Sequence, residues 1–419
     1  MRYCFPPDAD FFRSSAVGKG SRTYSSMAEM GISSRRSFLV QLSAVAIAGR
    51  VGSARGLWAS TPSNLVFAGV YTDNKGSTSR GIYAFRWDPD EGTLAPLGLA
   101  VATPNPSFLT LSPDRRHLYA VNELDSFQGQ KTGSVSSFAV EGDSGKLKPI
   151  NMVSSMGTGP CNIAVDYTGK AVFTANYGSG SAASFRVLHG GKLSKAVSMF
   201  QYSGHVANPE RQADPHAHCT TVSPDNRYVL VNDLGLDRIS VYHLDPLTAR
   251  LTPNDPAFYE ALPGSGPRSF TFHPNGRWAY SLNEIANTVD ALTWDGERGA
   301  LTRVQNISTL PEGFSGPNTA ATVAVDSAGR FLYTSNRGDD SVAVFAISDH
   351  DGTLKPVQHV PCGGKEPRHF ALDPGNQWLL VANQDSSNIV VFSRNARSGH
   401  LTPTGREYPL SFPVCILFR

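Results

Sequence analysis

The chain has 419 residues and a formal net charge of +2, from 37 basic and 35 acidic side chains, so nothing in its charge indicates a nucleic-acid-binding surface. Charged residues make up only 17% of the chain, whereas glycine (39) and proline (28) are plentiful. This composition suits many short strands joined by turns, in a chain long enough to bury a large core.

The first 60 residues differ from the rest. The stretch SSRRSFLVQLSAVAIAG places Arg35 and Arg36 before an apolar run that is too short to cross a membrane as a helix. This layout is typical of a twin-arginine export signal, although a disordered tail with a chance arginine pair would look similar. We expect residues 1–60 to be an export signal and disordered leader. The protein would then lie in the periplasm or be secreted, without a stable membrane anchor.

A turn-and-strand pattern recurs after residue 63. It reads SPDRRHLYAVNE at 112–123, SPDNRYVLVND at 223–233 and HPNGRWAYSLNE at 273–284. The strand-terminal asparagine returns about every 50 residues, at Asn122, Asn176, Asn232, Asn283, Asn336 and Asn383. A second pattern, two apolar strands around a tight turn, recurs seven times, for example as SVAVFAISDHDGTL at 341–354. Four strands per repeat of this length predict a β-propeller.

The number of repeats predicts how the ring closes. Seven outer strand pairs face only six inner hairpins, so one innermost strand is missing from the series. The C-terminal stretch FPVCILF, residues 412–418, supplies it if it pairs with LVFAGVY, residues 65–71. We therefore predict an all-β fold, a seven-bladed β-propeller with four antiparallel strands per blade, as a single domain over residues 61–419.

Charged residues recur at one end of the predicted inner hairpins. The start of the first strand and the end of the second lie at the same end of a hairpin, so these positions should surround one funnel around the axis. The first strands start at Ser107, Cys161, His218, Arg268, Ala321, Arg368 and Val414. The second strands end at Tyr71, Glu123, Tyr177, Asp233, Glu284, Arg337 and Gln384. Arginines beside acids and a histidine indicate a site for a small anion with acid–base groups at hand.

These residues allow two other interpretations. The charges could be ion pairs that tie blades together, such as Arg268 with Glu284. If they are instead solvated and functional, replacing Arg268 or Glu284 should reduce activity rather than stability. His216 and His218, in RQADPHAH, could ligate a metal with Asp233, but no further ligand completes a convincing set. We expect no metal and no cofactor.

The cysteines and the missing motifs narrow the chemistry. Four cysteines lie in apolar strands without C-x-x-C spacing, so we expect buried free thiols rather than disulfides: Cys161, Cys219, Cys362 and Cys415. There is no G-x-S-x-G elbow and no phosphate-binding glycine loop with lysine, which disfavours a serine nucleophile. Glu284 or His218 activating a water molecule fits the residues better.

Several motifs in order resemble the seven-bladed β-propeller lactonase family, which includes propeller-type 6-phosphogluconolactonase and the fungal carboxymuconate-lactonising enzyme. They include NPSFLTLSPDRRHLYAVNE, RQADPHAH, GPRSFTFHPNGRWAYSLNE, TSNRGDDSVAVF and VANQDSSNIVVF, and the resemblance covers about residues 64–419. It implies metal-independent lactone chemistry with catalytic roles for His218, Arg268, Glu284 and Arg337. One departure is Ser269, which stands where the family has a histidine; we expect its side chain to point away from the funnel.

The favoured function is hydrolysis of an anionic sugar-acid lactone, as by 6-phosphogluconolactonase, in a chain that acts as a monomer. The arginines would hold the anionic substrate and the developing oxyanion. The residues expected to contact substrate are Arg368, Glu123, Tyr177, Arg211, His216, Asp233 and Gln384. Two alternatives stay open, a muconate-type lactonising cycloisomerase and a propeller that binds a ligand without catalysis.

Overall fold

A computed structural model describes residues 64–204 and 210–419 of the chain. Residues Ser60–Arg419 form one compact unit, and all the strands discussed below belong to it. The predicted export signal at Arg35 and Arg36 lies outside the described residues. Within the described residues, no helix is long and apolar enough to cross a membrane.

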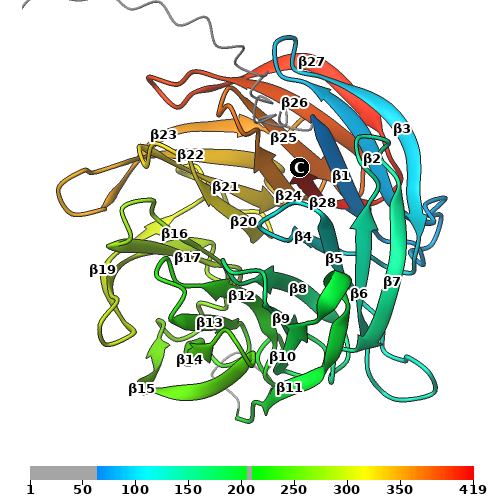
Figure 1. Ribbon diagram of the computed structural model, residues 1–419. Coiled ribbons are helices and arrows are strands. Elements are labelled where there is room, and N and C mark those ends of the chain that lie inside the picture. Colours follow the sequence, from blue (N-terminus) through cyan, green and yellow to red (C-terminus); the bar gives the residue numbers. More distant parts are fainter. Residues whose placement is uncertain (1–63, 205–209) are drawn as a thin grey trace, which may run out of the picture. The chain divides into compact units, whose positions relative to one another are not determined.

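The unit is built from seven four-stranded antiparallel sheets, which confirms the predicted β-propeller (Figure 1). We number the blades along the chain and give their strands from the axis outward. Blades 1 to 4 are β28 (Pro413–Phe418), β1 (Leu65–Val70), β2 (Gly81–Asp88), β3 (Thr93–Ala102); β4 (Phe108–Leu111), β5 (His117–Asn122), β6 (Ser134–Val140), β7 (Leu147–Ser154); β8 (Pro160–Val165), β9 (Ala171–Asn176), β10 (Ser181–Val187), β11 (Leu193–Gln201); and β12 (Ala217–Val222), β13 (Tyr228–Asp233), β14 (Arg238–Asp245), β15 (Arg250–Glu260). Blades 5 to 7 are β16 (Pro267–Phe272), β17 (Trp278–Asn283), β18 (Thr288–Asp295), β19 (Ala300–Ser308); β20 (Thr319–Val325), β21 (Phe331–Arg337), β22 (Ser341–Ile347), β23 (Leu354–Pro361); and β24 (Pro367–Leu372), β25 (Trp378–Asn383), β26 (Asn388–Arg394), β27 (Leu401–Pro409).

The two ends of the propeller unit meet in blade 1. Strand β28 pairs antiparallel with β1, with Val66 opposite Phe418 and Gly69 opposite Cys415. Each innermost strand also contacts the innermost strand of the next blade, from β4 round to β28 and back to β4. The predicted closure of the ring by the terminal strands is therefore confirmed.

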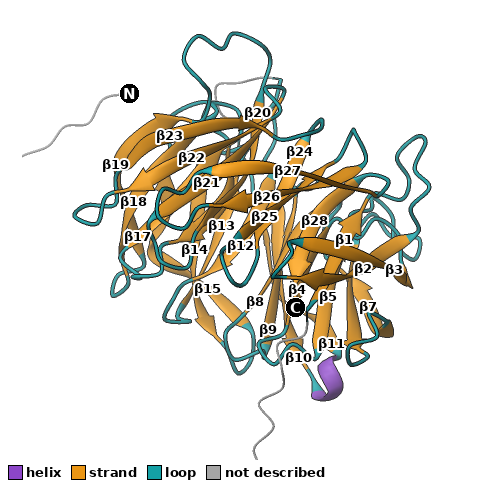
Figure 2. Cartoon of the chain, turned by 90° about the horizontal axis from the view of Figure 1, so that it is seen from above, coloured by secondary structure: helices purple, strands orange, loops and turns teal. Residues whose placement is uncertain are grey.

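Nearly all of the regular secondary structure in the described part of this unit is strand, and loops join the strands (Figure 2). In the described residues, the helical element is a single 3₁₀ turn, η1 (His189–Gly191), between β10 and β11. The second strand of each blade is almost entirely buried, as in β1, β9 and β17, where every residue is buried.

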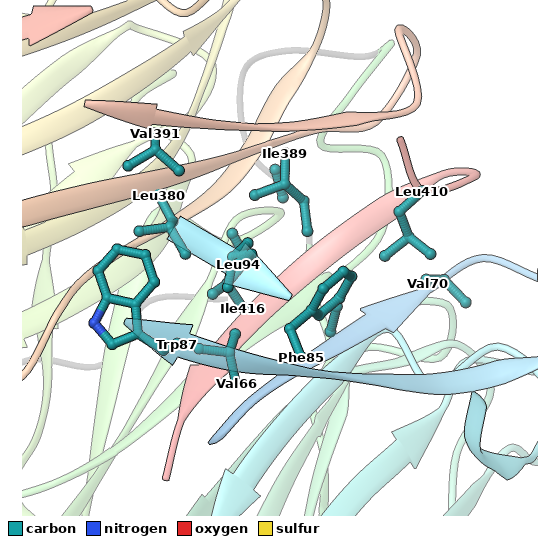
Figure 3. Close-up of a cluster of buried hydrophobic side chains, with 12 residues drawn as sticks. Val66, Val70, Phe85, Trp87, Leu94, Leu380, Ile389, Val391, Leu410 and Ile416 are labelled. Atoms are coloured by element: carbon teal, nitrogen blue, oxygen red, sulfur yellow. The ribbon is translucent and has the colours of Figure 1, made fainter. Parts of the chain in front are cut away.

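Apolar side chains fill the space between neighbouring blades. Between blades 7 and 1, Phe85 and Trp87 of β2 pack with Leu380 of β25 and Val391 of β26, and Ile416 of β28 joins them (Figure 3). Burying each such side chain contributes about 1.5–3 kcal/mol. The closing strand therefore contributes core as well as backbone hydrogen bonds.

The recurring turn has a clear structural purpose. In blade 4, the Ser223 hydroxyl donates to Asp225 and accepts the backbone N–H of Tyr228 at 2.9 Å. Asn226 completes the turn with φ of 61°, a left-handed conformation that asparagine tolerates well. The strand-terminal asparagine is structural too: Asn122 donates to the carbonyl of Pro104 and so fixes the segment that enters its blade.

Candidate active site

A β-bulge aims the first residues of the innermost strands at the axis. In blade 4, Ala217 pairs with Asp233 and Cys219 with Asn232, so His218 is an extra residue on the inner strand. The same irregularity places Arg268 between Pro267 and Ser269 of β16. Such bulges bend the strand and redirect a side chain, and they are common beside active sites.

Blade 7 repeats this arrangement at its own inner strand. Pro367 pairs with Asn383 and His369 with Ala382, which leaves Arg368 as the extra residue of β24. The repeated bulge therefore delivers a histidine and two arginines from three separate blades to one axial space.

Two adjoining cavities lie on the axis. The mouth cavity has a volume of ≈ 260 Å³ and is lined by Tyr71, Glu123, Cys161, Tyr177, Arg211, His218, Glu284, Arg337 and Arg368. The axial cavity has a volume of ≈ 210 Å³ and shares Cys161, His218 and Arg368 with the first. All the predicted inner-strand starts except Ala321 line the axial cavity. The convergence inferred from the repeat is thus present in the structure.

Three guanidinium groups surround the carboxylate of Glu284. Oε2 lies 2.7 Å from Nε of Arg268 and 2.9 Å from a terminal nitrogen of Arg337. Oε1 accepts a hydrogen bond from Arg211 at 2.5 Å. Arg337 also lies 3.5 Å from Glu366, and Arg268 donates to the backbone carbonyl of Ala321. Both carboxylate oxygens of Glu284 are therefore occupied by protein cations.

Electrostatics keep this cluster ionised. Burial alone would raise the pKa of Glu284, but Arg337 and then Arg268 lower it far below the usual value for a glutamate. Burial lowers the pKa of Arg268, and the nearby charge of Arg337 adds to this, giving about 10. At neutral pH the cluster therefore consists of a carboxylate held between cations.

His218 lies between the two cavities, close to the same arginines. Burial, followed by the charge of Arg268, lowers its pKa well below the usual value for histidine. Its ring meets the ring of Tyr177 edge-on, with centroids 5.7 Å apart. The imidazole is therefore neutral at physiological pH and suited to hydrogen bonding rather than to carrying charge.

A second group of polar residues occupies another part of the mouth cavity. Tyr71, directly after β1, donates its hydroxyl to Oε2 of Glu123, directly after β5, at 3.0 Å. The guanidinium of Arg368 lies over the Tyr71 ring, 5.2 Å from its centroid. It makes no hydrogen bond or ion pair with any residue in 64–204 or 210–419. Arg368 is thus a cation with donors left for a ligand.

The remaining predicted contact residues are placed differently. Tyr177 lines the mouth cavity, with His216 stacked behind it at 4.4 Å between ring centroids. Asp233 is 1% exposed and lies outside the cavity lining, because its Oδ1 accepts the backbone N–H groups of His216 and Leu236. Gln384 bonds to Asp385 on the rim. His216, Asp233 and Gln384 therefore lie outside the lining of the mouth cavity.

Ser269 lines the axial cavity beside Arg268 and is absent from the lining of the mouth cavity. The bulge at Arg268 breaks the simple alternation of side chains along β16, so the direction expected for Ser269 stays a prediction. Tyr71 was not predicted as a site residue, although it occupies the same position at the end of its strand as Glu123 and lines the mouth cavity.

The cysteines in the described part of the chain are buried. Cys161, Cys219, Cys362 and Cys415 are buried free thiols, as expected. Burial raises the pKa of Cys161, which lines both cavities, so its thiol stays protonated. Among the described residues, no group of three or more His, Cys, Asp or Glu side chains is placed to hold a metal ion.

A seven-bladed propeller with arginines, carboxylates and a histidine gathered at one axial mouth defines an enzyme-like site for a small polar molecule. The family model described as "Lactonase, 7-bladed beta-propeller" matches residues 65–418. The chain therefore belongs to the seven-bladed lactonase family and is an enzyme of the lactonase type, a carboxylic-ester hydrolase. The resemblance found in the sequence is confirmed.

Named relatives agree with this family over most of their length. The chain is 34% identical to a 6-phosphogluconolactonase of Bacillus subtilis over 352 residues, which is 84% of this chain and 97% of the relative. It is also 34% identical to a 6-phosphogluconolactonase of Formosa agariphila, covering 82% of this chain and 96% of the relative. The solved structure of a periplasmic gluconolactonase of Pseudomonas aeruginosa superimposes with a TM-score of 0.79 at 34% identity, covering 84% of this chain and 98% of that one.

Proposed function

We propose that the protein hydrolyses a sugar-acid lactone at the mouth cavity of the propeller. The observation that carries the proposal is the Arg368 guanidinium, which faces the cavity without a hydrogen bond or ion pair to any described residue. A cation in this state can bind the carbonyl oxygen of a lactone and stabilise the oxyanion formed on attack by water. The cavity volume of ≈ 260 Å³ suits a small molecule.

The Glu284 cluster would act as a preassembled wall of the site. Arg337 and Arg211 line the cavity and are fixed in place by the carboxylate between them. Donors that do not reorganise during the reaction stabilise developing charge more effectively than mobile ones. Glu284 would therefore contribute chiefly by positioning Arg337 and Arg211, and Arg268 by holding Glu284 in place.

The cellular compartment of the protein limits which lactones it can meet. We propose that Arg35 and Arg36 direct the chain out of the cytoplasm, where the substrate would be a lactone of the periplasm or the exterior. A relative described as a periplasmic gluconolactonase supports this location. Both an aldonolactone and its 6-phosphate therefore belong in the first substrate panel.

Proton release on purified protein tests the function. Each lactone that opens yields an acid, so a pH-stat follows glucono-1,5-lactone, 6-phosphogluconolactone and γ-butyrolactone against the spontaneous rate. Hydrolysis above that rate with a sugar-acid lactone supports the proposal. Cyclisation of a muconate without lactone hydrolysis would assign the lactonising reaction instead. Ligand binding without turnover of either class would make the propeller a binding protein. Gel filtration of the same sample tests the expected monomer.

A further inference from the structure

Lactone hydrolysis needs a group that takes a proton from the attacking water, and such a group must have a free acceptor atom at the cavity. Glu284 does not meet this requirement, because one carboxylate oxygen accepts from Arg211 and the other contacts Arg268 and Arg337. Burial raises the pKa of Glu284, but the charges of Arg337 and Arg268 outweigh this effect and keep the pKa far below its usual value. Glu284 is therefore a poor proton acceptor in the free enzyme.

His218 is also a weak candidate. Protonating its imidazole would place a further positive charge in a buried space beside Arg268 and Arg368, and its lowered pKa reflects this cost. A neutral histidine that resists protonation can donate or accept a hydrogen bond, but it takes a proton from water reluctantly. The two groups that the sequence favoured are thus disfavoured by their surroundings.

Glu123 is the other carboxylate in the lining of the mouth cavity. Its Oε2 accepts the Tyr71 hydroxyl at 3.0 Å, whereas Oε1 has no hydrogen-bond partner in the described part of the chain. Its backbone is held on both sides: its N–H donates to the carbonyl of Asn105 at 3.0 Å, and the Asn105 amide donates back at 3.2 Å. One oxygen is therefore anchored and the other is available.

Tyr71 also connects Glu123 to Arg368. The Arg368 guanidinium lies over the ring whose hydroxyl bonds to Glu123, and the guanidinium and the carboxylate attract each other without meeting in an ion pair. Burial raises the pKa of Tyr71 well above its usual value, so its hydroxyl remains a donor and does not compete for the proton. A proton acceptor and an oxyanion donor thus stand side by side in one cavity.

We propose that Glu123 is the general base of the hydrolysis, with Tyr71 as the residue that positions it and Arg368 as the group that binds the carbonyl oxygen. The proposal rests on the proposed function of the same cavity. Water attacks the carbonyl carbon while Glu123 takes one of its protons, and the carbonyl electron pair moves to the oxygen held by Arg368. When the pair returns, the bond from the carbonyl carbon to the ring oxygen breaks. Glu123 gives its proton to that oxygen, and the acid product ionises with net release of one proton.

The test is the Glu123→Gln variant of the full chain. An amide oxygen still accepts the Tyr71 hydroxyl, so the fold is retained, but the amide cannot take a proton. We expect kcat/KM to fall by about 10²–10⁴-fold, the usual contribution of a general base. The midpoint of thermal unfolding should be unchanged. Glu260→Gln, on the exposed outer strand β15, is the matched control and should keep full activity.

A further measurement separates a catalytic base from a structural carboxylate. Glu123→Ala should recover activity when formate is added, because formate can replace the missing carboxylate.

The outcomes also separate this proposal from the proposed function. If the wild type hydrolyses a lactone and Glu123→Gln keeps its rate, the base is another group and the function stands. A Glu123→Gln variant that loses activity and folding stability together, with no formate rescue in Glu123→Ala, would make Glu123 structural. If the wild type hydrolyses no lactone in the panel, the proposed function and the role of Glu123 both fall.

Discussion

Arg268 and Glu284 face each other across the innermost hairpin of blade 5, with Nε and Oε2 2.7 Å apart and each side chain 6% exposed. The Arg268–Glu284 ion pair, which was one interpretation of the sequence, is therefore present in the structure. It does not stand alone, because the same carboxylate also binds Arg337 of blade 6 and Arg211, which precedes blade 4. One buried anion thus joins segments of three blades and at the same time shapes the wall of the mouth cavity.

Because Glu284 is buried between cations, its replacement should reduce the stability of the fold. We expect Glu284→Gln to lower the free energy of unfolding by about 3–5 kcal/mol, because it leaves Arg268 and Arg337 as buried like charges without an anion. The sequence alone indicated little loss of stability, on the assumption that these groups are solvated. Urea unfolding at neutral pH measures the difference. Glu260→Gln serves as the exposed control and should stay within about 0.5 kcal/mol of the wild type. A stable Glu284→Gln protein would mean that water reaches the cluster.

The same carboxylate should make stability depend on acid pH. Its pKa is lower in the folded protein than in the unfolded chain, where a glutamate titrates near pH 4.3. Its contribution is therefore fully present above about pH 4–5 and is lost as the pH falls below that range. Wild-type unfolding free energy should decline between about pH 5 and pH 3, and the Glu284→Gln curve should be flatter there. Other buried acids contribute to both curves, so the difference between the curves is the quantity to measure. Parallel curves would contradict the prediction.

The fold could be predicted in detail because its signals are local and repeated. Turn residues such as Ser223 and Asn226 are required by hairpin geometry, so they recur with each blade. The count of strands showed that FPVCILF must complete blade 1, and the pairing of Gly69 with Cys415 bears this out. Counting sufficed because a ring without free edges allows only one way to close.

The site could be predicted only in part. The repeat located the ends of the inner hairpins, and Glu284, Arg337 and Arg368 do reach the mouth cavity. The bulge at Arg268 was not visible in the sequence, since it depends on how two strands pair, and it breaks the simple alternation from which the direction of Ser269 was predicted. Which charges neutralise each other also depends on three-dimensional distances. For this reason the sequence could not separate Glu284, which is enclosed by cations, from Glu123, which has a free oxygen.

The ring closure predicts the effect of a C-terminal deletion. Removing residues 412–419 takes away β28, which supplies buried Cys415 and Ile416 and covers the edge of β1. We expect the shortened chain to lack a cooperative unfolding transition and to aggregate through the exposed strand edges. Arg419→Ala is the control, because it keeps all of β28 and should unfold cooperatively. A folded, soluble protein without residues 412–419 would contradict the closure.

The twin-arginine assignment predicts where the chain is found in the cell. Changing Arg35 and Arg36 together to lysine should retain the protein in the cytoplasm, because recognition of this class of signal depends on the arginine pair. Arg55→Lys, after the apolar run, keeps the charge pattern and the pair and should not affect export. Cell fractionation followed by immunodetection measures the distribution. Periplasmic double-lysine protein would show that export uses another signal.

Arg368 should be the residue whose loss separates activity from stability most clearly. Its guanidinium lies over the Tyr71 ring and has no ion pair with any described residue, so Arg368→Ala removes little that holds the fold together. We expect the variant to unfold at nearly the wild-type temperature, with kcat lower by about 10²–10³-fold, as when an oxyanion donor is lost. Arg368→Lys should recover only part of this, because an ammonium cannot reproduce the planar fork of donors.

Arg406→Ala provides the matched control for Arg368. Arg406 also lies over an aromatic ring, that of Trp378, with its guanidinium carbon 5.7 Å from the centroid, but it belongs to the outer strand β27 and does not line the mouth cavity. Its replacement should leave kcat/KM unchanged. If Arg368→Ala keeps the wild-type rate while both variants lose similar stability, Arg368 serves to pack against Tyr71. The oxyanion would then have to be held by Arg337 or Arg211. Both of these guanidinium groups already contact the Glu284 carboxylate.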